Sequence, residues 1–149
     1  MILETLKSLF NRDLLKLKTE IELYRNEDNL WRITGSISNS AGNLCLHLIG
    51  NLNTYIGAGL LKTNYVRQRD LEFSLKNISK AELIEKIEAT IAVVDQSLDS
   101  LSVNDLVKDF PIMIRDKSTE MEYTLLHLLT HLNYHLGQIN YHRRLLDND

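Results

Sequence analysis

Apolar residues recur at spacings of three and four along four separate stretches of the chain, with charged or polar residues between them. The first stretch covers residues 2–25, and its apolar positions fall on one side of a helical wheel: Leu3, Leu6, Phe10, Leu14, Leu17, Ile21 and Tyr24. A single apolar stripe of this period is typical of an α-helix that buries one face. We therefore expect a first helix over residues 2–25.

Three further stretches predict three further helices. The apolar positions of the second stretch, residues 40–61, are Leu44, Leu48, Leu52, Tyr55 and Ile56. The third stretch covers about residues 79–100 and opens with Ser79 and Glu82, which have the spacing of a capping box, where each side chain accepts from the other residue's free backbone N–H. The fourth stretch covers residues 119–146 and opens with a similar pattern.

The segments between these stretches lack a helical period. Residues 26–39 gather Asn, Ser and Gly, residues 62–78 are charged and aperiodic, and residues 101–118 hold the only proline, Pro111. Four helices with one apolar stripe each bury their faces best as a four-helix bundle. The chain has 149 residues, 44% hydrophobic and 25% charged, so we expect a single all-α domain over residues 1–149.

Charge and cysteine content narrow the class of protein. The net charge is −3 and the 17 Lys and Arg residues are scattered among 20 acidic ones, which argues against a nucleic-acid surface. The single cysteine, Cys45, cannot form an internal disulfide, and the first residues are charged too often for a secretory signal. Residues 33–61 carry no charge, but polar residues interrupt them, so we interpret them as a loop and a buried helix. We expect a cytoplasmic protein with no nucleic-acid or membrane partner.

The five histidines are confined to the two helices that are nearly free of charge. His47 lies on the second, and the others lie on the fourth: His127, His131, His135 and His142. On a helical wheel, His135 and His142 lie about 20° and 40° outside the apolar arc, and His131 about 60°. His127 lies about 100° away, nearer the rim. His131 and His135 therefore flank the core.

His131 and His135 form an HxxxH pair, which brings two imidazoles to the same side of a helix. A third ligand must come from another helix, and His47 is the only histidine outside the fourth helix. Three neutral nitrogen ligands would leave positions open for water or substrate, as catalytic metal sites do. Nitrogen ligation suits Zn²⁺, Ni²⁺, Cu²⁺ or Fe²⁺, and the sequence does not choose among them.

Other interpretations of the histidines stay open at this point. A di-iron carboxylate site needs a Glu three residues before a His, and this chain has none; an HExxH motif is also absent. Histidines at the edge of a core usually form hydrogen bonds with a neighbour or with water. The histidines of this bundle would then never converge, or would form a structural cluster.

Three segments resemble one known group of proteins. The run HLNYHLGQI, residues 131–139, resembles the HxxxHxGQI signature of DinB-like proteins, the superfamily that includes bacillithiol S-transferases and mycothiol-dependent maleylpyruvate isomerases. Residues 39–51 resemble the second-helix segment of an uncharacterised branch of that superfamily, and RDLEF, residues 69–73, resembles an element after that helix. The resemblance covers nearly the whole chain in order and spacing.

The resemblance implies a DinB-like four-helix bundle in which three histidines hold a divalent metal, and these map onto His47, His131 and His135. Members of known activity use the metal to activate a low-molecular-weight thiol. We therefore expect a Zn or Ni protein that acts on a small molecule as a thiol S-transferase or hydrolase. The alternative is a non-catalytic metal-binding or stress-response bundle. A homodimer is compatible with the sequence, which contains no signal that demands one.

Residues around the predicted ligands are candidates for supporting roles. Gln138 lies on the same side of the fourth helix as the ligands, and Asn51 follows His47 by one turn, so each can hydrogen-bond near the metal. His127 is a candidate neighbour of the site. Arg67 and Arg69 are candidates for lining a cleft and attracting an anionic substrate, although a solvated loop explains them equally.

Overall fold

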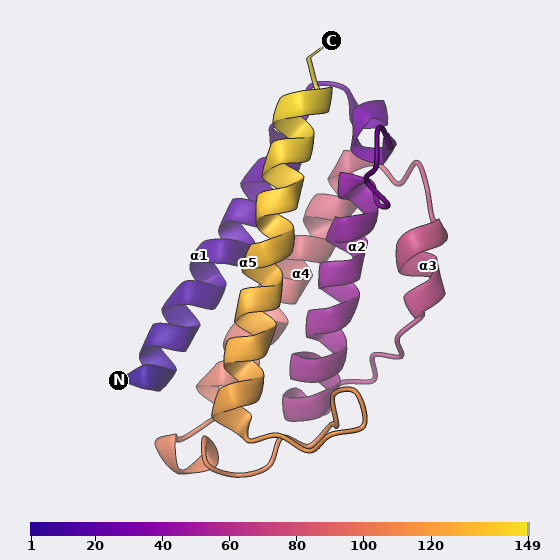
Figure 1. The fold of residues 1–149 in the computed structure, drawn as a ribbon. Coiled ribbons are helices and arrows are strands. Elements are labelled where there is room, and N and C mark those ends of the chain that lie inside the picture. The colour runs from indigo at the N-terminus through magenta and orange to yellow at the C-terminus, as the bar shows by residue number, and fades with distance from the viewer. Residues whose placement is uncertain (149) are drawn as a thin grey trace.

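The apolar stripes become the inner faces of four long helical segments in the computed structural model, which describes residues 1–148. These are α1 (Ile2–Glu22), α2 (Ala41–Leu52) with its extension η2 (Asn53–Leu61), α4 (Lys80–Asp99) and α5 (Met121–Leu146). α1 packs against α4 and α5, and α2 packs against the same two helices (Figure 1). No β-strand occurs among the described residues, so the prediction of an all-α helical bundle is confirmed.

The first helix ends earlier than its apolar pattern does. All seven predicted stripe positions are buried, but α1 ends at Glu22 rather than at residue 25. Tyr24 is 1% exposed although it lies in the connection to the 3₁₀ turn η1 (Glu27–Trp31). Periodicity therefore marks which residues are buried more accurately than it marks where the helix ends.

The second helix changes its winding halfway along. Ser40 caps α2 by accepting from the backbone N–H of Asn43, and every residue from Ala41 to Leu52 is buried. The chain then continues as the π-helix η2, whose turns are wider. The Asn53 amide donates to the carbonyl of Ile49, and α4 contacts η2 directly. The sequence predicted a single uniform helix here.

The segment Ala41–Leu61 is long and apolar enough to match a membrane span by length and composition alone. In the structure, 67% of its apolar window is buried inside the bundle. Protein side chains thus cover most of this segment, as expected for the predicted buried helix.

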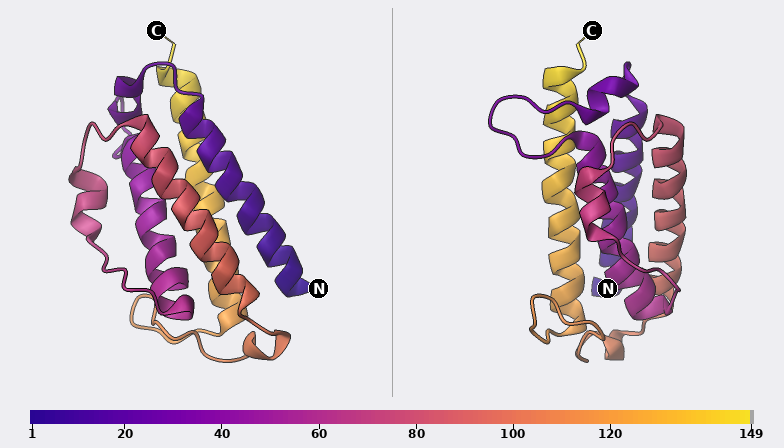
Figure 2. Two further views of the ribbon diagram at one scale, coloured as in Figure 1. Left: turned by 180° about the vertical axis from the view of Figure 1, so that it is seen from behind. Right: turned by 90° about the vertical axis from the view of Figure 1, so that its right-hand side faces the viewer.

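Two local expectations need correction. The charged segment between η2 and α4, predicted to be irregular, contains a short helix, α3 (Arg69–Ser74), which packs on α2 (Figure 2). The pattern at residues 119–122 does not form a capping box, because Thr119 bonds the Thr124 hydroxyl instead and α5 has no side-chain cap. At the start of α4, one half of the predicted capping box is present, with the Ser79 hydroxyl accepting from the Glu82 backbone N–H.

Hydrogen bonds fasten the C-terminal end of α5 to the connection after α1. Asp147 accepts from the backbone N–H groups of Arg25 and Asn26 and from the Asn29 amide. The buried His142 donates from Nε2 to the carbonyl of Arg32 at 2.8 Å, which leaves Nδ1 to accept from the Tyr24 hydroxyl at 2.7 Å. One imidazole therefore joins three parts of the chain.

The His142 contacts predict a dependence of stability on pH. Burial lowers the pKa of His142 below its ordinary value of 6.5, although the Arg32 carbonyl opposes the shift. A depressed folded-state pKa means that the stabilisation is present above about pH 6.5 and is lost as the pH falls below it, because the unfolded chain takes up the proton first. We expect the free energy of unfolding of His142→Gln, measured by urea denaturation, to fall less between about pH 7 and about pH 5 than that of the wild type. Parallel curves for the two proteins would contradict this expectation.

Candidate metal centre

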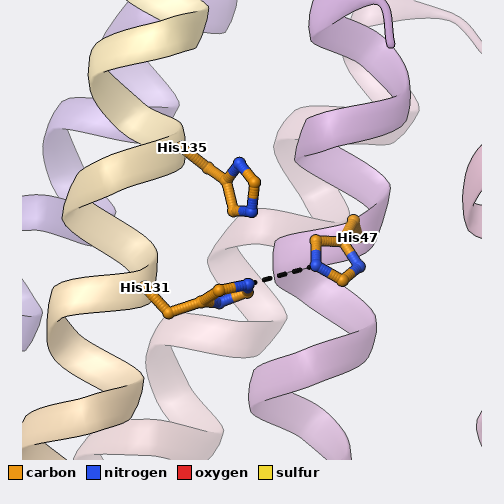
Figure 3. Close-up of side chains that lie close together, drawn as sticks. All are labelled: His47, His131 and His135. Atoms are coloured by element: carbon orange, nitrogen blue, oxygen red, sulfur yellow. Dashed lines mark hydrogen bonds between the residues drawn. The ribbon is translucent and has the colours of Figure 1, made fainter. Parts of the chain in front are cut away.

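Three histidines from two helices point their rings toward one another between α2 and α5 (Figure 3). His47 comes from α2, and His131 and His135 lie one turn apart on α5. One nitrogen of each ring lies within 4.8 Å of the corresponding nitrogen of the other two. The Nε2 atoms of His47 and His131 are 3.2 Å apart. The three residues predicted as ligands are therefore brought together, and this set could bind a metal ion.

A carboxylate from α3 orients the first histidine. His47 Nδ1 lies 3.0 Å from Glu72 Oε1, and because a carboxylate only accepts, Nδ1 carries the proton. The lone pair of His47 is then on Nε2, which faces His131. Phe73, the next residue of α3, packs against the His47 ring with 5.0 Å between centroids. A carboxylate that receives the outer N–H of a histidine is the usual support of a metal-binding imidazole.

Glu72 is itself held as a charged group. It is 6% exposed, and Arg67 donates to both of its carboxylate oxygens, at 2.8 and 2.9 Å. Burial raises the pKa of Glu72, but the hydrogen bonds from His47 and Arg67 outweigh burial and lower the pKa below its ordinary value. Glu72 is therefore an anion at neutral pH and remains an acceptor for His47.

The α3 segment reaches α2 because of two small features of that helix. The Asn43 amide donates to the backbone carbonyls of Glu72 and Leu75, both at 2.9 Å. Gly50 lies under the Glu72 carboxylate, and a Cβ at that position would overlap Glu72 Oε2. Asn43 thus fastens the segment, and Gly50 leaves the space that the carboxylate occupies.

The α5 histidines are also prepared to be neutral ligands. His135 Nδ1 lies 2.7 Å from Gln138 Oε1, which accepts the Nδ1 proton and leaves Nε2 free for the centre. Burial, followed by the neighbouring charges of His135 and His47, lowers the pKa of His131 to about 4. Burial also lowers the pKa of His135, against the effect of Gln138. Both rings are therefore uncharged at neutral pH, with one nitrogen of each free of a proton, which is the form that binds metals.

The donor set fits a divalent cation. With Zn–N bonds of about 2.0–2.1 Å, two nitrogens in a tetrahedral site lie about 3.3 Å apart, close to the separation of the His47 and His131 nitrogens. A cation between these atoms would replace the proton that the two rings otherwise share. Among the described residues no fourth His, Cys, Asp or Glu joins the set. A three-histidine site of this kind keeps coordination positions for water or a ligand.

A cavity of about 770 Å³ adjoins the centre, and His135 and Gln138 form part of its wall. The rest of the wall comes from the loop before α2, from Leu44 of α2 and from the C-terminal half of α5. Cavities of about 300–1,000 Å³ are the size that encloses small-molecule ligands. The cavity therefore gives a small molecule a place beside His135, one of the three histidines.

The other residues that the sequence suggested for supporting roles differ in how they lie relative to the three histidines and the cavity. Gln138 forms the predicted hydrogen bond with His135. Asn51 is buried, and its Oδ1 has no hydrogen-bond partner among residues 1–148. His127 is exposed and stacks on Tyr123, outside the three-histidine set. Arg69 lies over the Phe73 ring and does not line the cavity.

Glu72 is the functional residue that sequence reasoning missed. It is part of the RDLEF element, and its segment has no helical period that would indicate a buried face. The sequence makes Arg67 a candidate for attracting a substrate, whereas in the structure its guanidinium donates to both carboxylate oxygens of Glu72. One sequence signal for Glu72 exists: a Glu stands between an Arg and an aromatic residue, shortly after the helix that carries His47.

The Gly50 contact predicts the effect of a single methyl group. Gly50→Ala should push the Glu72 carboxylate away from His47 and cost about 1–3 kcal/mol of unfolding free energy, the usual range for overpacking a buried site. Gly137→Ala is the matched control, because a Cβ on Gly137 of α5 would meet no atom within 4 Å, and alanine there favours the helix. Chemical denaturation measures both variants. Equal stability of Gly50→Ala and the wild type would contradict this packing of Glu72 on α2.

Comparison with known proteins places the chain in a family. No curated protein matches the chain. The model of one family, described as a protein of unknown function (DUF1572), matches residues 2–149, which is nearly the entire length. The chain belongs to the DUF1572 family.

Proposed function

We propose that this protein is a DinB-like metal-dependent enzyme that acts on a small molecule, with Zn²⁺ or Ni²⁺ held by His47, His131 and His135. The observation that carries the proposal is the convergence of three imidazoles from two helices beside a cavity. A purely structural zinc site is normally closed by four protein ligands. The set of three among the described residues favours a catalytic centre over the alternative of a structural histidine cluster.

The chemistry of such a centre is the activation of a nucleophile. A bound divalent ion lowers the pKa of a coordinated water or thiol, so that the anion forms at neutral pH. The residues around the predicted metal position favour this lowering of the pKa. Three neutral ligands leave the positive charge of the ion uncompensated, and Glu72 and Gln138 hold two of the rings in the required orientation. These features support a hydrolase or a thiol S-transferase.

Metal content is the first test. Protein purified without an immobilised-metal column and then exposed to Zn²⁺ or Ni²⁺ should hold about one ion per chain by elemental mass spectrometry. His47→Ala, His131→Ala and His135→Ala should each lose it. His127→Ala is the control, because that exposed histidine lies outside the set and should leave metal binding unchanged. A wild type with less than about one tenth of an ion per chain would refute the metal centre.

The hydrogen bond between Glu72 and His47 gives a second test, in which metal affinity should fall but not disappear. Glu72→Gln keeps the shape of the side chain but removes the charge that Arg67 and His47 share. Changes to such supporting groups usually weaken metal affinity by about 10–100-fold. Competition with a chromophoric chelator measures the affinity, and circular dichroism checks that the variant is folded. Wild-type affinity in a folded Glu72→Gln would contradict the role given to this carboxylate.

Catalysis is tested with the metal-loaded protein. Bacillithiol, mycothiol and glutathione, each paired with a chromogenic electrophile, test thiol transfer, and an activated ester tests hydrolysis. We expect a rate with at least one of these pairs that disappears in His131→Ala. If every pair reacts at the rate of the metal-free protein, the centre is not an enzyme of the proposed type.

A further inference from the structure

The cavity beside the metal centre has an apolar wall. Ile37 comes from the loop before α2, Leu44 comes from α2, and Tyr134, Tyr141 and Leu145 come from α5. Figure 2 shows this loop reaching out beside the C-terminal half of α5. The two tyrosines are 66% and 64% exposed, unusually high values for large aromatic residues. Both tyrosines line the cavity.

The same wall is poor in charge. None of the described residues that line the cavity is an Asp, Glu, Lys or Arg. Arg144 lies over the Tyr141 ring, with 5.3 Å to its centroid, and is not part of the wall. His142 lines the cavity, but its two ring nitrogens are engaged by Tyr24 and Arg32. An anionic ligand would therefore meet no cationic partner among the residues that line the cavity.

The loop side of the cavity offers neutral polar groups instead. Ser36, Ser38 and Asn39 line it, and all three carry side chains that can donate or accept a hydrogen bond. A few such groups in an otherwise apolar wall are the usual means by which a pocket orients a neutral ligand.

We propose that this cavity binds an uncharged small molecule with a flat apolar body, and that the ligand's reacting end lies beside His135. The position of the reacting end rests on the proposed function, whereas the choice of an uncharged occupant does not. Thiols that carry free carboxylates, as glutathione does, find no cation in the described part of the wall. The distribution of charge on this face thus points away from the anionic substrate that Arg67 and Arg69 suggested in the sequence.

Two probes with the same naphthalene body and different charge test the occupant. We compare 2-naphthol, which is neutral at neutral pH, with 2-naphthoate, an anion, by isothermal titration calorimetry. The protein is kept free of metal so that the carboxylate cannot coordinate an ion, and circular dichroism verifies its helix content. The neutral probe should bind at least about tenfold more tightly than the anion. Equal affinities, or tighter binding of 2-naphthoate, would overturn the proposal.

A pair of matched variants locates the binding site. Ile37→Arg places a cation in the cavity wall, so it should lower the affinity for 2-naphthol and raise the affinity for 2-naphthoate. Ile33→Arg is the control, because Ile33 belongs to the same exposed segment, is 51% exposed and does not line the cavity. It should leave both affinities within about twofold of the wild type. The same change in both variants would place binding outside the cavity.

A third probe separates this inference from the proposed function. 2-Naphthohydroxamic acid carries the same body with a group that coordinates Zn²⁺, so it should bind more tightly to zinc-loaded protein than to metal-free protein. If the chain takes up no metal while 2-naphthol still binds, the proposed function is refuted and the proposal of an uncharged ligand is supported. If metal binds and 2-naphthol does not, the proposed occupant fails alone. Zinc-independent affinity of the hydroxamic acid would show that the cavity does not present its ligand to the centre.

Discussion

The hydrogen bond between His47 and Glu72 connects the two parts of the molecule on which the centre depends. One partner lies on the most buried helix of the bundle, and the other lies on a short helix outside it. A buried carboxylate is costly unless it is paired, so the Arg67 fork and the His47 ring are needed together. The closeness of α3 to α2, the tautomer of His47 and the direction of its free lone pair all follow from this arrangement.

The centre also depends on two helices that carry almost no charge where they meet. α2 is buried along its whole length, and the inner face of α5 alternates leucines with the histidines. In these surroundings a protonated imidazole is disfavoured, which keeps the pKa values of His131 and His135 low and their rings neutral. The same apolar packing that stabilises the bundle therefore prepares the donor atoms. Stability and metal affinity cannot be adjusted independently at these positions.

The sequence was informative where the physics is local or periodic. A repeat of three and four reports a buried face, so the apolar stripes and the flanking positions of His131 and His135 could be predicted. Glu72 could not, because its burial results from a contact across 25 residues that no period encodes. The wider turns of η2 depend likewise on packing against α4. The lack of a hydrogen-bond partner for Asn51 Oδ1 among the described residues could not be predicted either, because hydrogen-bond partners are set by how the helices pack.

His142 gives the cavity a link to the folding of the whole chain. Its ring forms part of the cavity wall, and its two nitrogens tie the ends of α1 and of the loop to α5. An occupant of the cavity rests on a surface that exists only while these ties are intact. Occupancy and unfolding are therefore thermodynamically coupled, and the chain becomes harder to melt in proportion to the logarithm of ligand concentration. A thermal shift thus serves as a reporter with which unlabelled compound collections can be searched for the natural ligand.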